Sequence, residues 1–219
     1  MLEKTYRRFA LVNGALSGWR RAYRRSIMER GERARAQGRE LRIIDIGSGG
    51  GDISRAIARW AREDDVPVRV VALDADPRAT EWAREQPGPA TVAYRTGMSA
   101  DVAESGERFD VVVSNHLLHH LTDPEMDALM NDSERLLSEG GLALHSDIER
   151  SRLAYGLFAA ATWPLQPTVL AGSFIRPDGL TSIRRSYTAD ELRARVRDGW
   201  TVRRAAPCRL ELRCGRRSA

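Results

Sequence analysis

The sequence is poor in cysteine, with only Cys208 and Cys214 in 219 residues. Two cysteines are too few for a disulfide framework or for a four-cysteine metal site, so we expect a reduced, cytoplasmic protein. No secretory signal is visible, because Glu3, Arg7 and Arg8 interrupt any early apolar run.

Lysine is nearly absent, since Lys4 is the only one among 35 basic residues. The arginines are spread along the whole chain, so the net charge of +5 does not indicate a nucleic-acid partner. Charge is also missing from residues 153–175, a run long enough to span a bilayer. That run contains Pro164, Gln166 and Pro167, which favour a buried or ligand-facing cap over a spanning helix. A peripheral contact with a membrane stays open.

Apolar strand patterns alternate with helical patterns through most of the chain. This alternation predicts a doubly wound, seven-stranded, mostly parallel α/β sheet of the Rossmann-like type. Asp123 is expected to cap a helix that begins at Pro124, continues through Ser138 and ends at two glycines, Gly140 and Gly141. The strands are expected at residues 41–46, 68–73, 91–95, 109–114 and 142–146, with a closing antiparallel pair at 201–205 and 209–214.

Three parts of the chain differ in character. Residues 1–38 form a basic helical arm with an apolar stripe, which either packs on the domain or closes over it as a lid. Residues 39–219 form the main domain, and residues 151–187 within it form a cap after the fifth strand. The apolar side chains of this cap are Leu153, Tyr155, Leu157, Phe158, Trp163, Leu165, Val169, Leu170 and Phe174.

A glycine-rich loop follows the first strand and precedes a helix, as in nucleotide-binding α/β domains. Its glycines stand at 47, 49, 50 and 51, and Asp45 comes just before them. Asp52 occupies the position where a dinucleotide-binding fingerprint has its third glycine. A P-loop is excluded, because no Gly-Lys-Ser/Thr follows the glycines.

The run Asp45-Ile46-Gly47-Ser48-Gly49-Gly50-Gly51 resembles the first motif of class I S-adenosylmethionine-dependent methyltransferases. The stretch from Phe109 to His116 resembles the fourth strand of that family. Leu118-His119-His120-Leu121 then continues as in small-molecule enzymes of the ubiquinone-methyltransferase-like type. The resemblance implies a Rossmann-like methyltransferase fold and S-adenosylmethionine as cofactor, with S-adenosylhomocysteine as its product.

The resemblance also implies which residues hold the cofactor. Asp45 is expected to face its cationic methionine end, and Asp74 at the end of the second strand is expected to bind the ribose hydroxyls. Met98 is expected to pack on the adenine and Ser99 to bond its edge. The full expected set is Asp45, Gly47, Ser48, Gly49, Gly51, Asp52, Asp74, Ala75, Met98, Ser99 and Asn115.

Catalytic candidates follow the fourth and fifth strands, because ligands bind at the carboxyl ends of the strands in this fold. Asn115 and His116 come first, and His116 is our preferred general base or substrate hydrogen-bond partner. His119 is the second candidate base, and Asp147 is expected to position the substrate. The histidine spacing permits a metal ion without demanding one, and we expect none.

These observations predict an enzyme that methylates a phenolic or enolic oxygen of a hydrophobic aromatic or polyketide-type small molecule. Methylation at a ring carbon of a quinone or phenol is the nearest alternative, because it needs the same deprotonated acceptor. An RNA or protein methyltransferase and a non-catalytic cofactor-binding relative are less favoured. We expect no nucleic-acid partner and a monomer or homodimer.

Overall fold

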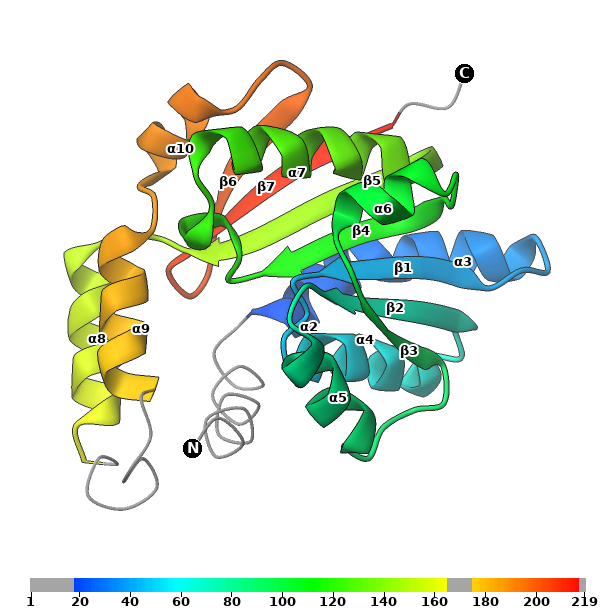
Figure 1. Cartoon of the computed structure of the whole chain (residues 1–219), viewed down its shortest axis with the longest axis horizontal. Coiled ribbons are helices and arrows are strands. Elements are labelled where there is room, and N and C mark those ends of the chain that lie inside the picture. Colours follow the sequence, from blue (N-terminus) through cyan, green and yellow to red (C-terminus); the bar gives the residue numbers. More distant parts are fainter. Residues whose placement is uncertain (1–17, 165–174, 217–219) are drawn as a thin grey trace.

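A seven-stranded sheet forms the centre of the protein, which confirms the predicted fold class. The computed structural model describes residues 18–164 and 175–216. The strand order is β3-β2-β1-β4-β5-β7-β6, and only β7 runs antiparallel to its neighbours (Figure 1). The strands are β1 Leu41–Ile46, β2 Val68–Asp74, β3 Val92–Thr96, β4 Phe109–Asn115, β5 Leu137–Ile148, β6 Trp200–Ala205 and β7 Arg209–Gly215.

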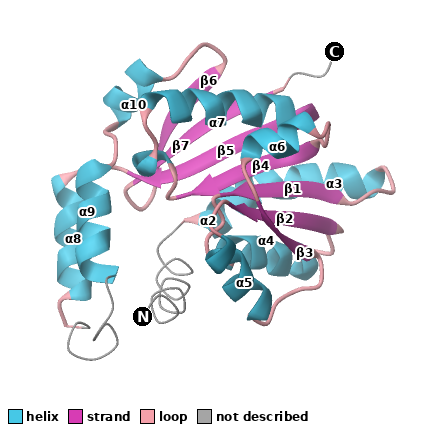
Figure 2. Cartoon of the chain, viewed as in Figure 1, coloured by secondary structure: helices cyan, strands magenta, loops and turns pink. Residues whose placement is uncertain are grey.

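Helices connect the parallel strands and cover both faces of the sheet (Figure 2). The first helical stretch contains a π-helical turn, η1, and a 3-10 turn, η2, follows β4. The helical elements are α2 Trp19–Ala22, η1 Tyr23–Ile27, α3 Met28–Ala36, α4 Asp52–Glu63, α5 Pro77–Glu85, α6 Ser99–Glu104, η2 Leu118–His120, α7 Asp123–Leu136, α8 Arg152–Thr162, α9 Ile175–Arg185 and α10 Ala189–Arg195.

The central strands are apolar on both faces, because each face is covered by helices. In β1, Ile43 joins one buried cluster and Ile44 the other, as expected where successive side chains point to opposite faces. The first cluster includes side chains of α2, η1, α3 and α4, and the second includes those of α6, α7 and α10. The two clusters hold the carboxyl ends of β1, β4 and β5 at one edge.

The described part of the N-terminal arm belongs to the core. Trp19, Tyr23 and Ile27 are at most 1% exposed and pack in the same cluster as the β1 side chains. This burial explains why the apolar stripe continues through residue 27. The lid interpretation concerns residues 1–38. Of these, residues 1–17 lie outside the described residues, and the described part packs on the domain.

The junction between α7 and β5 differs from our expectation. Glu125 accepts a hydrogen bond from the backbone N–H of Thr122 at 2.7 Å, so the helix is capped one residue earlier than predicted. The helix ends at Leu136, and β5 begins at the next residue. The prediction that Gly140 and Gly141 end the helix is therefore wrong. These glycines lie inside β5, next to an irregularity in its pairing with β4, and glycine within a strand often marks such a site.

Helices α8 and α9 pack against each other as a hairpin after β5 (Figure 1). Gly179 of α9 leaves room for the ring of Phe158, since an added Cβ would come within 2.3 Å of that ring. Residues 165–174 of the predicted cap lie outside the described residues. Among the described helices, none has the length and apolar character needed to cross a membrane.

Candidate functional site

A pocket of about 150 Å³ opens at the carboxyl ends of β1 and β4, where the fold predicts a ligand. Most of the predicted glycine loop lines it, together with the residues that follow β4. The lining residues are Asp45, Gly47, Ser48, Gly49, Gly50, Asp52, Ile53, Arg55, Trp82, Asn115 and His116.

The glycine loop presents bare backbone to this pocket. Gly49 has a φ of +51°, and a Cβ added there would meet no atom within 4 Å, so the loop is open to a ligand on that side. Asp45 is 1% exposed and accepts a hydrogen bond from Ser54 Oγ at 2.6 Å. Burial raises the pKa of Asp45 to about 7. The acidic groups Asp45 and Asp52 beside exposed backbone suit a cationic ligand and fit the ammonium and sulfonium of S-adenosylmethionine.

Asp74, at the end of β2, holds the backbone of the glycine loop in place. Its carboxylate accepts hydrogen bonds from the backbone N–H of Gly49 at 2.7 Å and of Asp76 at 2.9 Å. Each carboxylate oxygen keeps a lone pair for a further donor. Asp74 therefore stays a candidate for the ribose hydroxyls.

Five predicted cofactor residues lie outside the pocket lining, namely Gly51, Asp74, Ala75, Met98 and Ser99. The Met98 side chain is 58% exposed. The hydroxyl of Ser99 donates to Asp132 of α7 at 2.6 Å, so its proton is already committed. A bond from Ser99 to an adenine edge would have to use the hydroxyl oxygen as acceptor.

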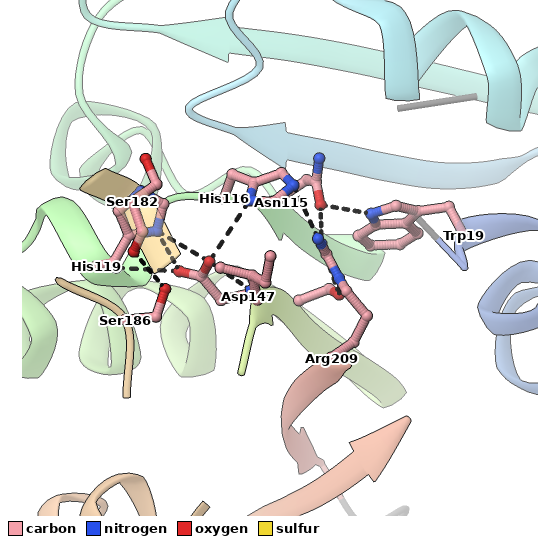
Figure 3. Close-up of polar contacts among 10 residues, drawn as sticks. Trp19, Asn115, His116, His119, Asp147, Ser182, Ser186 and Arg209 are labelled. Carbon is pink, nitrogen blue, oxygen red and sulfur yellow. Dashed lines mark hydrogen bonds and ion pairs between the residues drawn. The ribbon is translucent and has the colours of Figure 1, made fainter. Parts of the chain in front are cut away.

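Asn115 is held by its amide oxygen, and its amide nitrogen has no hydrogen bond to the part of the chain that the structure describes. Its Oδ1 accepts from Trp19 Nε1 at 2.9 Å and from Arg209 Nη2. Figure 3 shows these two donors converging on the carbonyl oxygen, with the amide nitrogen on the other side. Asn115 therefore offers two N–H donors at the pocket.

His116 has its Nε2 occupied by a donor. Arg209 Nη1 lies 2.8 Å from that nitrogen, and a guanidinium can only donate. Nε2 must therefore accept, which places the ring proton on Nδ1, 3.6 Å from Asp147 Oδ1. Burial, together with the charge of Arg209, lowers the pKa of His116 to about 4 despite the opposing effect of Asp147. His116 is thus neutral at pH 7, and its remaining lone pair is engaged.

The backbone at His116 is left-handed, with a φ of +57°. Its N–H donates to Ser146 O at 2.9 Å, which fixes the turn from β4 towards η2. Such conformations are costly for residues other than glycine and occur often at functional sites. The turn brings His119 over the end of β5.

His119 has the opposite arrangement of nitrogen atoms. Its Nδ1 lies 2.9 Å from Asp147 Oδ1, and its backbone N–H donates to Asp147 Oδ2 at 3.0 Å (Figure 3). Burial alone would raise the pKa of Asp147, but the N–H groups of His116 and His119 outweigh it and hold that pKa well below its usual range. The ionised carboxylate only accepts, so His119 carries its proton on Nδ1.

His119 Nε2 therefore carries no proton and has a lone pair that can accept one. It is buried and has no hydrogen-bond partner among residues 18–164 and 175–216. Helix α9 contacts η2, and Figure 3 shows His119 beside Ser182 of that helix and Ser186, which follows its end. A buried nitrogen without a partner is rare, and it marks a place where a ligand could donate a proton.

The two remaining histidines lie apart from this chemistry. His145 is buried between Ser114 and Ser133, whose hydroxyls lie 2.8 Å and 3.1 Å from its ring nitrogens. Its ring stacks on Trp200, and burial lowers the pKa of His145 to about 3. His120 is exposed, and its ring centroid lies 4.1 Å from that of His119.

His116, His119 and Asp147 offer ligand atoms within 4.8 Å of one another. The cationic Arg209 binds one of these three groups directly, which disfavours a second cation there. Both rings direct a proton towards the carboxylate, so hydrogen bonding accounts for the contacts. We therefore treat the three residues as a proton-holding network.

Sequence reasoning missed Arg209, Arg55 and Trp82. Arg209 reaches Asn115, His116 and Ser146 from the start of β7. Nothing distinguishes it among so many arginines, and its role depends on the pairing of β7 with β5. Arg55 and Trp82 lie in α4 and α5 at positions that a helical pattern does not separate from surface residues.

Known proteins share both the sequence pattern and the fold. A family model described as a methyltransferase domain matches residues 19–198. A ubiquinone biosynthesis O-methyltransferase of Cereibacter sphaeroides (strain ATCC 17025 / ATH 2.4.3) is 35% identical over 158 residues, which cover 68% of this chain and 60% of that protein. The corresponding protein of Ruegeria sp. (strain TM1040) is 35% identical over 65% of this chain and 58% of its own length. The match thus spans about 60% of the length of these curated relatives.

Solved structures agree at the level of the fold. The plantazolicin methyltransferase BpumL in complex with SAH has a TM-score of 0.59 at 12% identity, over 81% of this chain and 76% of that one. Human N-acetylserotonin methyltransferase in complex with SAM has a TM-score of 0.53 at 12% identity, over 81% of this chain and 48% of that one. With the glycine loop, the acidic residues around it and the matched family model, these likenesses show that the chain belongs to the class I S-adenosylmethionine-dependent methyltransferases.

Proposed function

We propose that this protein methylates a phenolic or enolic oxygen of a hydrophobic small molecule, with His119 as the general base. The observation that carries this proposal is the lone pair on His119 Nε2. It is unpartnered among the described residues, and Asp147 holds the opposite nitrogen of the ring at 2.9 Å. A histidine oriented by a carboxylate is a recurrent arrangement for removing a proton from a hydroxyl group.

The residues of the network have distinct roles in this reaction. S-adenosylmethionine, when bound, supplies a methyl group on a positively charged sulfur, which keeps the electron pair of the broken bond. His119 Nε2 takes the acceptor's proton as the oxygen forms its new bond, and Asp147 stabilises the resulting imidazolium. Asn115 lines the pocket and offers its amide N–H donors to a bound ligand. His116 is neutral, but its Nε2 lone pair already accepts a hydrogen bond from Arg209. We therefore assign the general base to His119.

The glycine loop and the acidic residues around it would hold the cofactor. Asp45 and Asp52 would face its cationic end, and Asp74 would bind the ribose while it anchors Gly49. Backbone atoms of Gly47 and Gly49 would lie against the ligand.

Two observations support a hydrophobic acceptor. The relatives are named ubiquinone biosynthesis O-methyltransferases, and we infer a quinone-related acceptor from that name. The α8 face also keeps large apolar groups exposed, with Leu153 64% and Leu157 55% accessible. Because α9 contacts η2, an acceptor reaching His119 Nε2 must displace part of this hairpin.

The test is His119→Asn, with His120→Asn as the matched control. Asparagine keeps an N–H where His119 Nδ1 donates to Asp147 but removes Nε2, so kcat should fall by about 10²- to 10⁴-fold. Cofactor affinity should stay unchanged, and the control should keep its activity. The acceptors are a panel of catechols, hydroxyquinones and polyketide-like phenols, and the methylated atom is located by NMR.

The outcomes separate the alternatives. A product carrying the new methyl group on carbon would replace O-methylation by C-methylation with the same base. Wild-type turnover in His119→Asn would refute the assignment of the base. Methylation of RNA in preference to every phenol would refute the substrate class.

A further inference from the structure

Arg209 is a buried cation that makes no ion pair among the described residues, although the charges of Asp147 and Glu211 act on it. It is 4% exposed, and no acidic oxygen lies within 4.0 Å of its guanidinium among the described residues. Its partners are the neutral groups of Ser146, Asn115 and His116. Buried charges are normally paired, so this arrangement carries a cost that a function has to justify.

The donors of Arg209 determine where protons sit in the neighbouring network. A guanidinium has no acceptor and stays charged, so His116 Nε2 can only accept from it. The single ring proton of His116 is then on Nδ1 and faces Asp147 Oδ1 at 3.6 Å. The same carboxylate receives the Nδ1 proton of His119 at 2.9 Å.

We propose that Arg209 is a positioning residue that keeps His116 neutral and so reserves the charge of Asp147 for His119. This inference rests on the proposed function, because it explains how His119 keeps a free lone pair and an ionised partner. Without Arg209, His116 Nε2 is free to take a proton. The imidazolium formed there would pair with Asp147 and repel a proton arriving on His119.

The charged groups around the two rings make the direction of this effect clear. His116 faces Arg209 on β7, Asp147 on β5 and His119 on η2. Of these, Arg209 opposes a second positive charge on His116 and Asp147 favours it. His119 lies between Asp147 and His120, which is itself near Arg185 of α9. Burial lowers the pKa of His116 most, and Arg209 lowers it further. Removal of Arg209 takes away the second of these effects, whereas burial and Asp147 remain.

The direct test is the protonation state of His116 in the full chain, measured by ¹⁵N NMR of the imidazoles between pH 5 and 9. The wild-type ring should stay neutral, with its proton on Nδ1, throughout that range. In Arg209→Met the His116 pKa should rise above its wild-type value, because burial remains but the guanidinium no longer opposes protonation. Arg209→Lys keeps a cation and a donor and should restore the neutral ring. Arg213→Met is the matched control on β7, since that arginine bonds Ser26 and Glu211 and lies outside the network.

The kinetic readout is the pH profile of kcat/KM for the best phenol of the acceptor panel. Arg209→Met should lose activity by the order of tenfold at pH 6 and recover as pH rises, because deprotonation of His116 returns Asp147 to His119. A loss independent of pH would mean that Arg209 is merely structural.

The NMR measurement needs no acceptor, so it decides the inference even where the proposed reaction fails. A wild-type His116 with its proton on Nε2 would overturn the inference. So would an Arg209→Met ring whose pKa is no higher than in the wild type. If Arg209→Met does not fold, the wild-type and Arg209→Lys spectra still decide, because a charged His116 in both would contradict it.

Discussion

Replacement of Asp147 by asparagine tests the proposed base through its partner. Asp147 accepts three hydrogen bonds within 3.0 Å, from His119 Nδ1, the His119 backbone and the Ile148 backbone. His119 Nδ1 lies 2.9 Å from one carboxylate oxygen and 3.0 Å from the other. Whichever way the new amide is turned, its NH₂ group lies within about 3.0 Å of Nδ1 and competes with the remaining amide oxygen for that nitrogen, which favours Nδ1 as an acceptor. The His119 proton should move to Nε2, which abolishes the lone pair needed for catalysis.

The size of the effect follows from that tautomer change. General-base catalysis contributes about 10²- to 10⁴-fold, so kcat should fall by this factor, equivalent to about 3–5 kcal/mol of activation free energy. One backbone N–H also loses its acceptor in a buried site, which should lower the free energy of unfolding by about 1–3 kcal/mol. The two effects differ enough to be measured separately.

The assay is single-turnover methyl transfer in saturating cofactor, with thermal unfolding followed in parallel. Asp110→Asn is the matched control, since Asp110 is also buried and bonds Arg39 and the backbone of Arg42 away from the pocket. It should lose stability without a comparable loss of kcat. A folded Asp147→Asn with wild-type kcat, or with the His119 proton still on Nδ1 by ¹⁵N NMR, would refute the reasoning.

Two further predictions concern the cofactor pocket. Burial raises the pKa of Asp45 to about 7, and a bound cation favours the ionised carboxylate, so S-adenosylmethionine affinity should increase as pH rises from 6 to 8. Titration calorimetry in buffers of different ionisation enthalpy should detect the proton released on binding, and the pH dependence should vanish in Asp45→Asn. Because the folded-state pKa of Asp45 is raised, its contribution to the free energy of unfolding is lost as pH rises through about 7. Asp45→Asn should therefore stabilise the cofactor-free protein more at pH 8 than at pH 5. Asp74→Ala removes the acceptor for Gly49 N–H as well as the proposed ribose contact, so cofactor affinity should fall by at least about tenfold, and unchanged calorimetric affinity would exclude Asp74 from binding.

The sheet could be predicted from the sequence because each central strand is buried on both faces. Runs such as Val68–Leu73 contain little besides apolar residues, and Gly47 and Asp74 mark where β1 and β2 reach the ligand edge. The start of β5 could not be predicted in the same way. Gly140 and Gly141 have the composition of a helix end, and only the pairing of Leu137 with Phe109 shows that the strand has already begun.

The cofactor loop was likewise predictable, because its glycines and Asp45 are adjacent in sequence. The positions after β3 were less so. Met98 and Ser99 follow the expected strand, yet one is exposed and the other bonds α7. The hydrogen bond from Ser99 to Asp132 cannot be predicted from the local sequence, because Asp132 belongs to α7, a helix that packs on α6.

The choice between His116 and His119 shows where sequence spacing stops being informative. Proximity to the end of β4 favours His116, and by that criterion it is the better base. What decides the matter is the donor that each ring faces, and Arg209 reaches His116 from a strand 93 residues further along the chain. Two histidines that share one carboxylate therefore differ in chemistry. His116 Nε2 accepts a hydrogen bond from a guanidinium, whereas His119 Nε2 has no donor among the described residues. A histidine beside the cofactor pocket is then a base only if nothing in the fold donates to it.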